Sequence, residues 1–188
     1  MKTQLHQYLN RYVVFNDEEI DAIYERLALK TFKKKEYLLQ EGQTCDAYYF
    51  VLSGLVRSYY TTVNGHEKIT HFALENWWLT DLESFVSNTA SYTTIQALEK
   101  TQILVLTKEV LESLYLKIPK LERLFRIITE KTLIAEQRRS SIYLQMSSRD
   151  RYLYLITNFP SFAQRVPQYM IASYLEITPE YLSELRKK

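Results

Sequence analysis

One uninterrupted helical pattern, from Pro119 to Met146, most constrains how this chain can fold. It contains no glycine and opens with a proline at a position suited to the first turn of a helix. At roughly 3.6 residues per turn, it predicts a helix of some seven turns. Its apolar face suits packing along a partner helix and is formed by Leu121, Leu124, Ile128, Ala135 and Ile142. Polar residues interrupt this apolar face. The alternative to packing along a partner helix is therefore that the long helix lies against the β domain of its own chain.

A region of different texture precedes this helix, between Phe32 and Thr107. Short runs of β-branched and aromatic residues recur there between turn signals, and all three glycines of the chain lie within it. The region therefore predicts an antiparallel β domain. Its clearest turn signal is Asn64-Gly65, because both positions of a type I′ turn require a positive φ. We expect a hairpin at this point.

Helices are predicted on both sides of the β region. The stretch from Asn16 to Lys30 has Asn16 as a candidate N-cap, acidic residues in its first turn and one apolar face, which predicts a short amphipathic helix. After Gly65 the chain has no glycine, and Thr107 begins a capping-box-like sequence before a second helical pattern. The second half of the chain is therefore expected to be helical.

The composition is that of an ordinary globular protein. With 46% hydrophobic and 24% charged residues among 188, there is enough apolar material for a sizeable core, in one large domain or two unequal ones. The net charge of +2 is too small to indicate nucleic-acid binding by itself. The N-terminal residues lack the pattern of a signal peptide, and no apolar stretch approaches 18 residues. We therefore expect a cytoplasmic protein without a membrane anchor.

Residues that could bind a metal or support catalysis are few. Cys45 is the only cysteine, which excludes an internal disulfide and leaves no thiolate cluster for zinc or an iron–sulfur centre. His66 and His71 are five residues apart, an odd spacing that points their side chains to opposite faces of a strand. We therefore expect no metal, no cofactor and no enzymatic activity.

The C-terminal stretch has the pattern of two short helices joined by a turn. Pro167 to Tyr174 predicts the first helix, the residues "LEIT" turn the chain, and Thr178 is a candidate N-cap for a second helix with Pro179 at its first position. The apolar residues that could bury the contact between the two helices are Ile171, Leu175, Ile177, Leu182 and Leu185. Such a pair is typical of a helix-turn-helix, whose second helix contacts base edges with its N-terminal half.

The chain resembles the catabolite activator and fumarate–nitrate regulator (Crp/Fnr) family, and specifically its short members common in Bacteroidetes. The segments that carry the resemblance are "WWLTDLESF" (77–85), "RYLYLITNFPSFAQRVPQ" (151–168) and "IASYLEITPEYLSELRKK" (171–188). It implies an α+β protein with an antiparallel β-roll of the cyclic-nucleotide-binding kind and flanking helices at 1–118, a dimerisation helix at 119–146, and a helix-turn-helix domain without a full wing at 147–188.

The function implied by this resemblance is that of a homodimeric DNA-binding transcription regulator. The β-roll would favour one arrangement of the long helix and of a hinge at 147–151 over another. This arrangement would set the spacing of the two DNA-reading helices in the dimer. The residues expected to contact double-stranded DNA are Thr178, Glu180, Tyr181, Ser183, Glu184, Arg186 and Lys187.

Three residues of the C-terminal segment, and its net charge, depart from the family pattern. Glu176, Tyr181 and Glu184 stand where many members have a small residue, a threonine and an arginine, respectively. From Ser147 to Lys188 there are six basic and four acidic residues, a net of only +2 for a segment that must contact phosphates. The alternative is a β-roll module that binds a ligand or a protein partner, with a helical tail that no longer reads DNA.

The segment that would bind a cyclic nucleotide also departs from the family pattern. Thr80 and Asp81 replace a glycine–glutamate pair, Ser91-Tyr92 replace the phosphate-binding arginine pair, and no arginine lies between Arg57 and Arg123. We therefore expect no response to cyclic AMP and no haem or iron–sulfur sensing. Two alternatives are left open for another small-molecule effector. Aromatic side chains could line an apolar cavity that binds it, or the same side chains could fill the interior and leave no cavity. The candidate effector residues are Phe72, Trp78, Thr80, Asp81, Leu82, Glu83, Ser91 and Tyr92.

Overall fold

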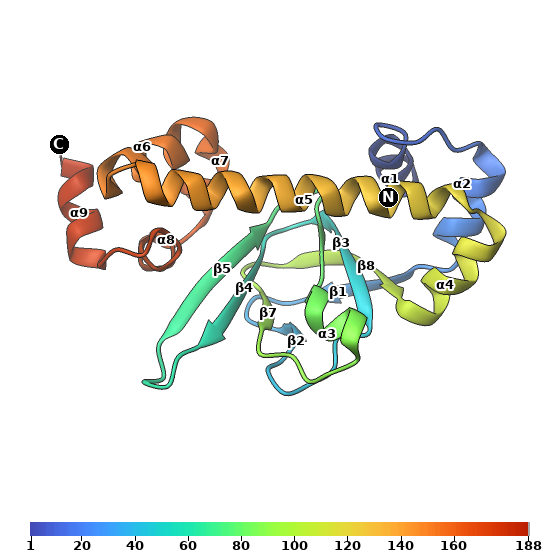
Figure 1. Cartoon of the computed structure of the whole chain (residues 1–188), viewed down its shortest axis with the longest axis horizontal. Coiled ribbons are helices and arrows are strands. Elements are labelled where there is room, and N and C mark those ends of the chain that lie inside the picture. The colour runs from blue at the N-terminus through green and yellow to red at the C-terminus, as the bar shows by residue number, and fades with distance from the viewer. Residues whose placement is uncertain (188) are drawn as a thin grey trace.

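The computed structural model describes residues 1–187 and shows two antiparallel sheets crossed by one long helix, with helices gathered at both of its ends (Figure 1). Lys188, the last of the C-terminal basic residues, lies outside the described part. This is the antiparallel β-roll, long helix and helical C-terminal region expected from the sequence. The division into domains at 118 and 146 stays a prediction.

Each sheet has four strands, and all strand pairs are antiparallel. The first sheet has the order β1-β8-β3-β6, and its strands are β1 (Ala28–Phe32), β8 (Thr101–Thr107), β3 (Ala47–Ser53) and β6 (Trp78–Leu79). The second has the order β2-β7-β4-β5, and its strands are β2 (Tyr37–Leu39), β7 (Thr94–Ala97), β4 (Val56–Thr61) and β5 (Glu67–Ala73). Strand β5 therefore lies at the edge of its sheet.

The predicted hairpin forms between β4 and β5, but its turn is not type I′. Gly65 has a φ of +78°, whereas Asn64 is not among the described residues with positive φ. The N–H of Gly65 donates to the carbonyl of Thr62, and the N–H of Thr62 to that of His66. This is a longer loop that needs left-handed backbone only at its glycine. The dipeptide thus predicted the hairpin correctly and the turn type wrongly.

Two helices precede the sheets. The first, α1 (Lys2–Leu9), was not expected from the sequence, and it buries Leu5 and Leu9. The second, α2 (Asp17–Tyr24), begins as predicted, because the Asn16 side chain accepts from the N–H of Glu19 while Glu19 accepts from the N–H of Asn16. It ends six residues earlier than predicted, since the following chain pairs with β8 instead of continuing the helix.

After β5, the helices predicted to begin at Thr107 and Pro119 form as expected, whereas the short helix that follows β6 was not predicted. A short helix, α3 (Leu82–Ser87), follows β6. Thr107 caps α4 (Lys108–Lys117) by accepting from the N–H of Val110, and the long helix α5 (Lys120–Gln145) follows Pro119 directly. Both the cap and the proline were predicted to mark these helix starts. At Met146 the chain leaves the helix for four short C-terminal helices, α6 (Ser148–Asn158), α7 (Pro160–Arg165), α8 (Gln168–Leu175) and α9 (Pro179–Lys187).

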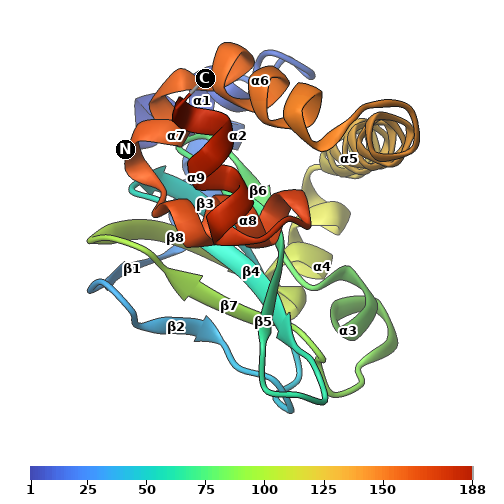
Figure 2. The ribbon, with the colours of Figure 1, turned by 90° about the vertical axis from the view of Figure 1, so that its left-hand side faces the viewer.

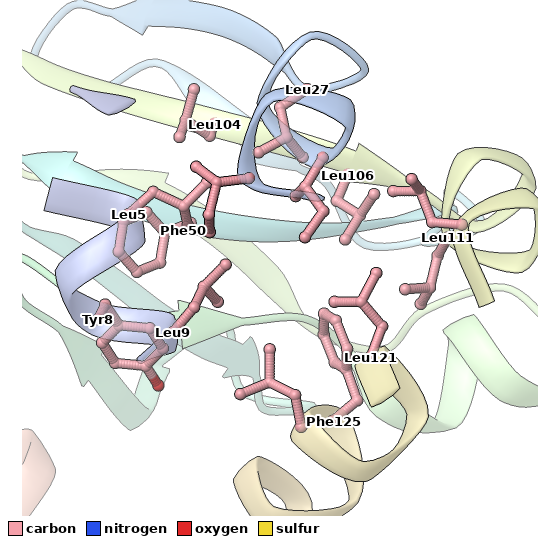
Figure 3. Packing of buried hydrophobic residues seen from close by; sticks show 14 of the residues in the cluster. Leu5, Tyr8, Leu9, Leu27, Phe50, Leu104, Leu106, Leu111, Leu121 and Phe125 are labelled. Carbon is pink, nitrogen blue, oxygen red and sulfur yellow. The ribbon is translucent and has the colours of Figure 1, made fainter. Parts of the chain in front are cut away.

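The largest apolar core lies where α1, α2, α4 and the start of α5 cover one face of the first sheet (Figure 3). Phe50 of β3 and Leu104 of β8 meet Leu5 of α1 and Leu121 of α5 there, and none of the four is more than 2% exposed. A separate core fills the space between the two sheets. The first of these cores, which contains Leu121, Leu124 and Phe125, fixes the N-terminal end of α5 to the β-roll.

A further core joins the C-terminal helices to the second sheet. Figure 2, seen from the C-terminal side, shows α8 above β4 and β5, and the same apolar cluster contains residues of β4 and β5 and of α6 to α9. No helix among residues 1–187 is long and apolar enough to cross a membrane.

Candidate DNA-binding interface

The two C-terminal helices pack as the sequence predicted. Leu175 of α8 and Leu182 of α9 are buried, and Leu185 lies partly buried against the same cluster. Between the helices, Glu176 has a φ of +56°, and the N–H of Ile177 donates to the carbonyl of Ala172. This left-handed residue closes α8 in the way that a glycine usually does. The connection therefore forms without the small residue that many Crp/Fnr-type members have at this place.

Thr178 starts α9 as an N-cap. Its side-chain oxygen accepts from the N–H of Tyr181 at 3.2 Å, and its carbonyl accepts from the N–H of Leu182 at 3.0 Å. Pro179 follows as the first helical residue, where its missing N–H costs nothing. The predicted cap is confirmed, so Thr178 has a structural task whether or not it also contacts DNA.

The outward face of α9 is polar and mixed in charge. Leu182 points inward, while the residues predicted to contact DNA on this helix are exposed, namely Glu180, Tyr181, Ser183, Glu184, Arg186 and Lys187. Figure 1 places the helix at the end of α5 that is farthest from α4, beyond the sheets. No other part of the described chain covers this face, so it is accessible to a large partner.

The basic residues that could extend this face are mostly engaged elsewhere. Arg165 is held by Glu75 and Glu99, and Arg151 donates to Ser148 and lies over the Tyr143 ring. Arg149 is exposed. Arg186 lines a depression of about 210 Å³ between α6, α7 and α8, where the buried Oε1 of Gln168 has no hydrogen-bond partner. Only some of the basic residues are thus available to phosphates.

The long helix α5 has two different halves. In its first half, Leu121 and Leu124 are 2% and 0% exposed, because they pack into the core of their own chain. Ile128 packs partly against the same core. Their assignment to a dimer seam is therefore wrong for Leu121 and Leu124, since a partner helix cannot reach them.

The second half of α5 carries the exposed apolar residues. Leu133 and Ile134 are 58% and 46% exposed, Leu144 is 86% exposed, and Ala135, which belongs to the predicted seam, is also exposed. A shallow groove of about 460 Å³ runs along this half, and its lining consists of Ile134, Gln137, Arg138, Ser141, Ile142, Gln145, Met146 and Tyr154. Ile142, of the predicted seam, lies in this groove.

The predicted effector segment does not converge on one cavity. Phe72 packs against Phe162 and Tyr174, so it belongs to the C-terminal core, and Trp78 packs against Phe50 and other aromatic rings in the largest core. The remaining predicted aromatic residue, Tyr92, is 77% exposed, and Leu82 and Glu83 are also exposed. The aromatic cavity therefore does not form from these residues, because they lie in different cores or on the surface.

Two polar residues of that segment, Asp81 and Ser91, do come together, while Thr80 bonds to the backbone. Asp81 accepts from the N–H of Ser84 at the start of α3, and the hydroxyl of Ser91 donates to its other carboxylate oxygen. Ser91 is 1% exposed, and Thr80 donates to the carbonyl of Ala47 at 2.9 Å. The positions where the family pattern has phosphate-binding residues thus carry a carboxylate and hydroxyls that bond to one another and to the backbone.

The one arginine near this segment in sequence is also engaged. Arg57 of β4 is 5% exposed, donates from Nε to Gln96 at 2.9 Å and pairs with Glu67. Its guanidinium lies 4.2 Å from the centre of the Tyr59 ring. This network could not be predicted from the sequence, because nothing local in the sequence shows that these residues of three strands are neighbours.

Among known protein families, one model matches the sheet region. The family model described as "Cyclic nucleotide-binding domain" matches residues 29–117, from β1 to the end of α4. This match covers the β-roll and leaves out the C-terminal helices.

Relatives and solved structures cover most of the chain. The regulatory protein HlyX of Actinobacillus pleuropneumoniae is 26% identical over 89% of this chain and 72% of its own, and the fumarate and nitrate reduction regulatory protein of Vibrio cholerae is 26% identical over 89% and 70%. In fold the chain is similar to FixK2 from Bradyrhizobium japonicum, with a TM-score of 0.74, 18% identity and coverage of 86% and 83%. It is also similar to the regulator CLP from Xanthomonas campestris, with a TM-score of 0.73, 16% identity and coverage of 92% and 90%. By these matches residues 29–117 resemble a cyclic nucleotide-binding domain, and the chain as a whole is similar in sequence to proteins named as regulatory proteins and in fold to FixK2 and CLP.

Proposed function

We propose that this regulator binds double-stranded DNA as a homodimer and reads it with α9. The observation that carries the proposal is the exposed helix itself, which is capped by Thr178, anchored by Leu182 and open along its outward face. A helix of this kind enters the major groove with its N-terminal residues nearest the bases.

The residues of α9 divide by their chemistry. Glu180 can accept from the amino group of a cytosine, and Tyr181 and Ser183 can reach a base or a phosphate. Arg186 and Lys187, in the last turn, suit backbone phosphates, whose charge they offset. Glu184 lies on the same exposed face and would disfavour contact with a phosphate.

The second half of α5 would form the dimer contact. Its exposed apolar residues and the groove beside Ile142 make a surface that a second copy of the helix can cover. In a two-fold dimer, the two copies of α9 need a separation of roughly 34 Å to reach successive major grooves on one face of DNA.

The signal that controls binding is not cyclic AMP in this proposal. The bonds between Asp81 and Ser91 occupy the place of the phosphate cradle, and the carboxylate would repel a phosphate. A different small-molecule effector, a cytoplasmic location and membership in the short Bacteroidetes-type group are further parts of the proposal. A lack of enzymatic activity is also part of the proposal, and the relatives described above are named as regulatory proteins.

The test is selection of duplexes from a random pool by the purified protein. Anisotropy titrations of the selected duplex and of a scrambled duplex, at two salt concentrations and with and without cyclic AMP, then give affinity, specificity and response. We expect an enriched inverted repeat, bound well above the scrambled duplex and equally with or without cyclic AMP. An affinity that rises with cyclic AMP would contradict the predicted lack of response.

A second candidate function rests on the charge of α9. Glu180 and Glu184 balance Arg186 and Lys187 on the exposed face, which favours a β-roll binding module whose C-terminal helices no longer read DNA. Binding that is equal for the selected and scrambled duplexes, and that salt abolishes for both, would support this alternative.

A further inference from the structure

The C-terminal helices cover the free edge of strand β5. The hydroxyl of Ser173 in α8 accepts from the N–H of Ile69 at 3.2 Å and donates to the carbonyl of Glu67 at 3.0 Å. An edge strand presents a row of unpaired backbone groups, and here a side chain of α8 pairs with two of them. The helix thus takes part in the hydrogen bonding of the sheet edge.

An ion cluster holds α7 against the loops beside that edge. The guanidinium of Arg165 donates to both carboxylate oxygens of Glu75, at 3.0 and 2.9 Å, and to Glu99 at 2.6 Å. Glu75 follows β5, Glu99 lies between β7 and β8, and Glu75 also accepts from the N–H of Gly54. An arginine that donates two parallel hydrogen bonds to one carboxylate fixes the relative orientation of the two side chains as well as their distance.

Apolar side chains fill the space between these polar contacts. Phe72 of β5 meets Phe162 of α7 and Tyr174 of α8, with ring centres 4.8 and 5.4 Å apart. Ile69 and Tyr59 belong to the same cluster and are 4% and 6% exposed. A rotation of the C-terminal helices away from the sheet would expose these side chains to water, which is costly.

The long helix joins the same contact through Arg139. Its guanidinium donates to the carbonyl of Thr70 in β5 and lies 4.4 Å from the centre of the Tyr174 ring. The hydroxyl of Tyr143, one turn further along α5, donates to the carbonyl of Tyr174. Burial raises the pKa of both tyrosines, so their rings stay neutral beside the cation. The dimer helix, the edge strand and α8 therefore meet at one arginine.

We propose that this contact, which we call the β5 dock and define by Arg139, Arg165 and Ser173 with β5 and Glu75, fixes the pose of α9 for DNA. The inference rests on the proposed function. In it, the β5 dock and not the expected hinge at 147–151 is the main connection through which the β-roll affects the position of α9. In the docked arrangement the outward face of α9 is exposed, so this is the arrangement that binds DNA. Arg165 and Arg139 are positioning residues, and any signal in the β-roll reaches α9 through the β4–β5 hairpin.

The experiment compares Arg165→Gln with the matched control Arg126→Gln. Each substitution removes one positive charge and its ion pairing, but Arg126 pairs with Glu130 inside α5 and does not contact the dock. Ser173→Ala serves as a second, milder variant. Two quantities are measured on the full chain: hydrogen exchange of the Ile69 amide, and affinity for the selected duplex and for duplexes whose half-sites are moved by one or two base pairs.

We expect Arg165→Gln to speed exchange of the Ile69 amide about tenfold and to weaken binding of the best duplex by a similar factor, with less discrimination between spacings. Ser173→Ala should reduce affinity and spacing discrimination in the same direction. The control variant should match the wild type in both measurements. A loss of affinity that is equal for all spacings would show a merely structural role for Arg165.

Two further results would overturn the inference. If Arg165→Gln and Ser173→Ala both bind and discriminate like Arg126→Gln, while the wild type reads DNA, the dock does not set the pose and the proposed function stands. If the wild type enriches no duplex, the pose-setting role fails together with the proposed function, and the exchange comparison shows only whether the dock persists in solution.

Discussion

Arg165 donates to both carboxylate oxygens of Glu75, a residue ninety positions earlier in the chain, and so ties the C-terminal helices to the end of strand β5. Both side chains are partly buried, at 28% and 36% exposure. Burial alone would raise the pKa of Glu75, but the hydrogen bonds from Arg165 and from the N–H of Gly54 lower it below its ordinary value. The carboxylate is therefore charged and paired at neutral pH.

The coupling between these two residues can be measured. In a double-mutant cycle of Arg165→Gln and Glu75→Gln, urea unfolding should give a coupling free energy of about 0.5–1 kcal/mol, because partly exposed pairs are screened by solvent. Additive effects of the two substitutions would show that the pair contributes nothing to stability.

The contribution of Glu75 should depend on pH. Its pKa is lower in the folded chain than the ordinary value of 4.5, so the stabilisation is present above pH 4.5 and is lost as the pH falls below that value through the folded pKa. The difference in unfolding free energy between the wild type and Glu75→Gln should therefore be constant from about pH 7 to about 5.5 and shrink at lower pH. A difference that grows on acidification would contradict this sign.

The two halves of α5 should respond differently to substitution. Leu121→Ala removes a side chain from the core and should destabilise the fold by roughly 2–4 kcal/mol. Ile134→Glu alters an exposed residue of the groove, so it should leave the fold intact and break the dimer. Sedimentation and urea unfolding distinguish these effects, and an intact dimer in Ile134→Glu would move the interface away from this groove.

Two glycines with positive φ should differ in their tolerance of alanine. At Gly54, with a φ of +100°, an added Cβ would lie 2.4 Å from Oγ1 of Thr101 and 2.9 Å from the carbonyl oxygen of Lys100. At Gly42, with a φ of +87°, it would meet nothing within 4 Å. Thermal unfolding should show a loss of roughly 2–4 kcal/mol for Gly54→Ala and about 1 kcal/mol for Gly42→Ala. Equal losses would mean that backbone strain alone, without the steric overlap, governs both positions.

The last turn of α9 should carry part of the salt dependence of DNA binding. Arg186→Ala with Lys187→Ala should weaken binding to all sequences and lower the slope of log affinity against log salt by about 0.9 for each phosphate that the variant no longer neutralises. The matched control, Lys33→Ala with Lys34→Ala, changes two exposed lysines between β1 and β2 and should not alter the slope. Glu180→Ala should instead relax the preference at one base pair. An unchanged slope in the first variant would show that these two residues do not bind phosphates.

Features that depend on a few neighbouring residues could be predicted from the sequence. The caps at Asn16, Thr107 and Thr178, the hairpin at Asn64-Gly65 and the long helix after Pro119 all formed where the sequence placed them. Each rests on hydrogen bonds or backbone preferences within about five residues, which act the same way in any fold.

Features that depend on distant partners could not be predicted. The helix expected to reach Lys30 stopped at Tyr24, because the next residues found a partner strand in β8. Leu121 fits a dimer seam equally well by spacing, but the N-terminal helices cover it first. Phe72 fits an effector pocket, but α7 and α8 lie against it.

The sequence by itself determined that this chain has an antiparallel β domain, a long helix and a capped C-terminal helix pair, because local periodicity and capping specify elements. Only the tertiary structure decided which apolar faces remain free and that Arg165, Arg139 and Ser173 fasten the C-terminal helices to β5. Periodicity shows which face of an element is apolar, but burial depends on which other element covers it. That choice is made by contacts between residues far apart in the chain.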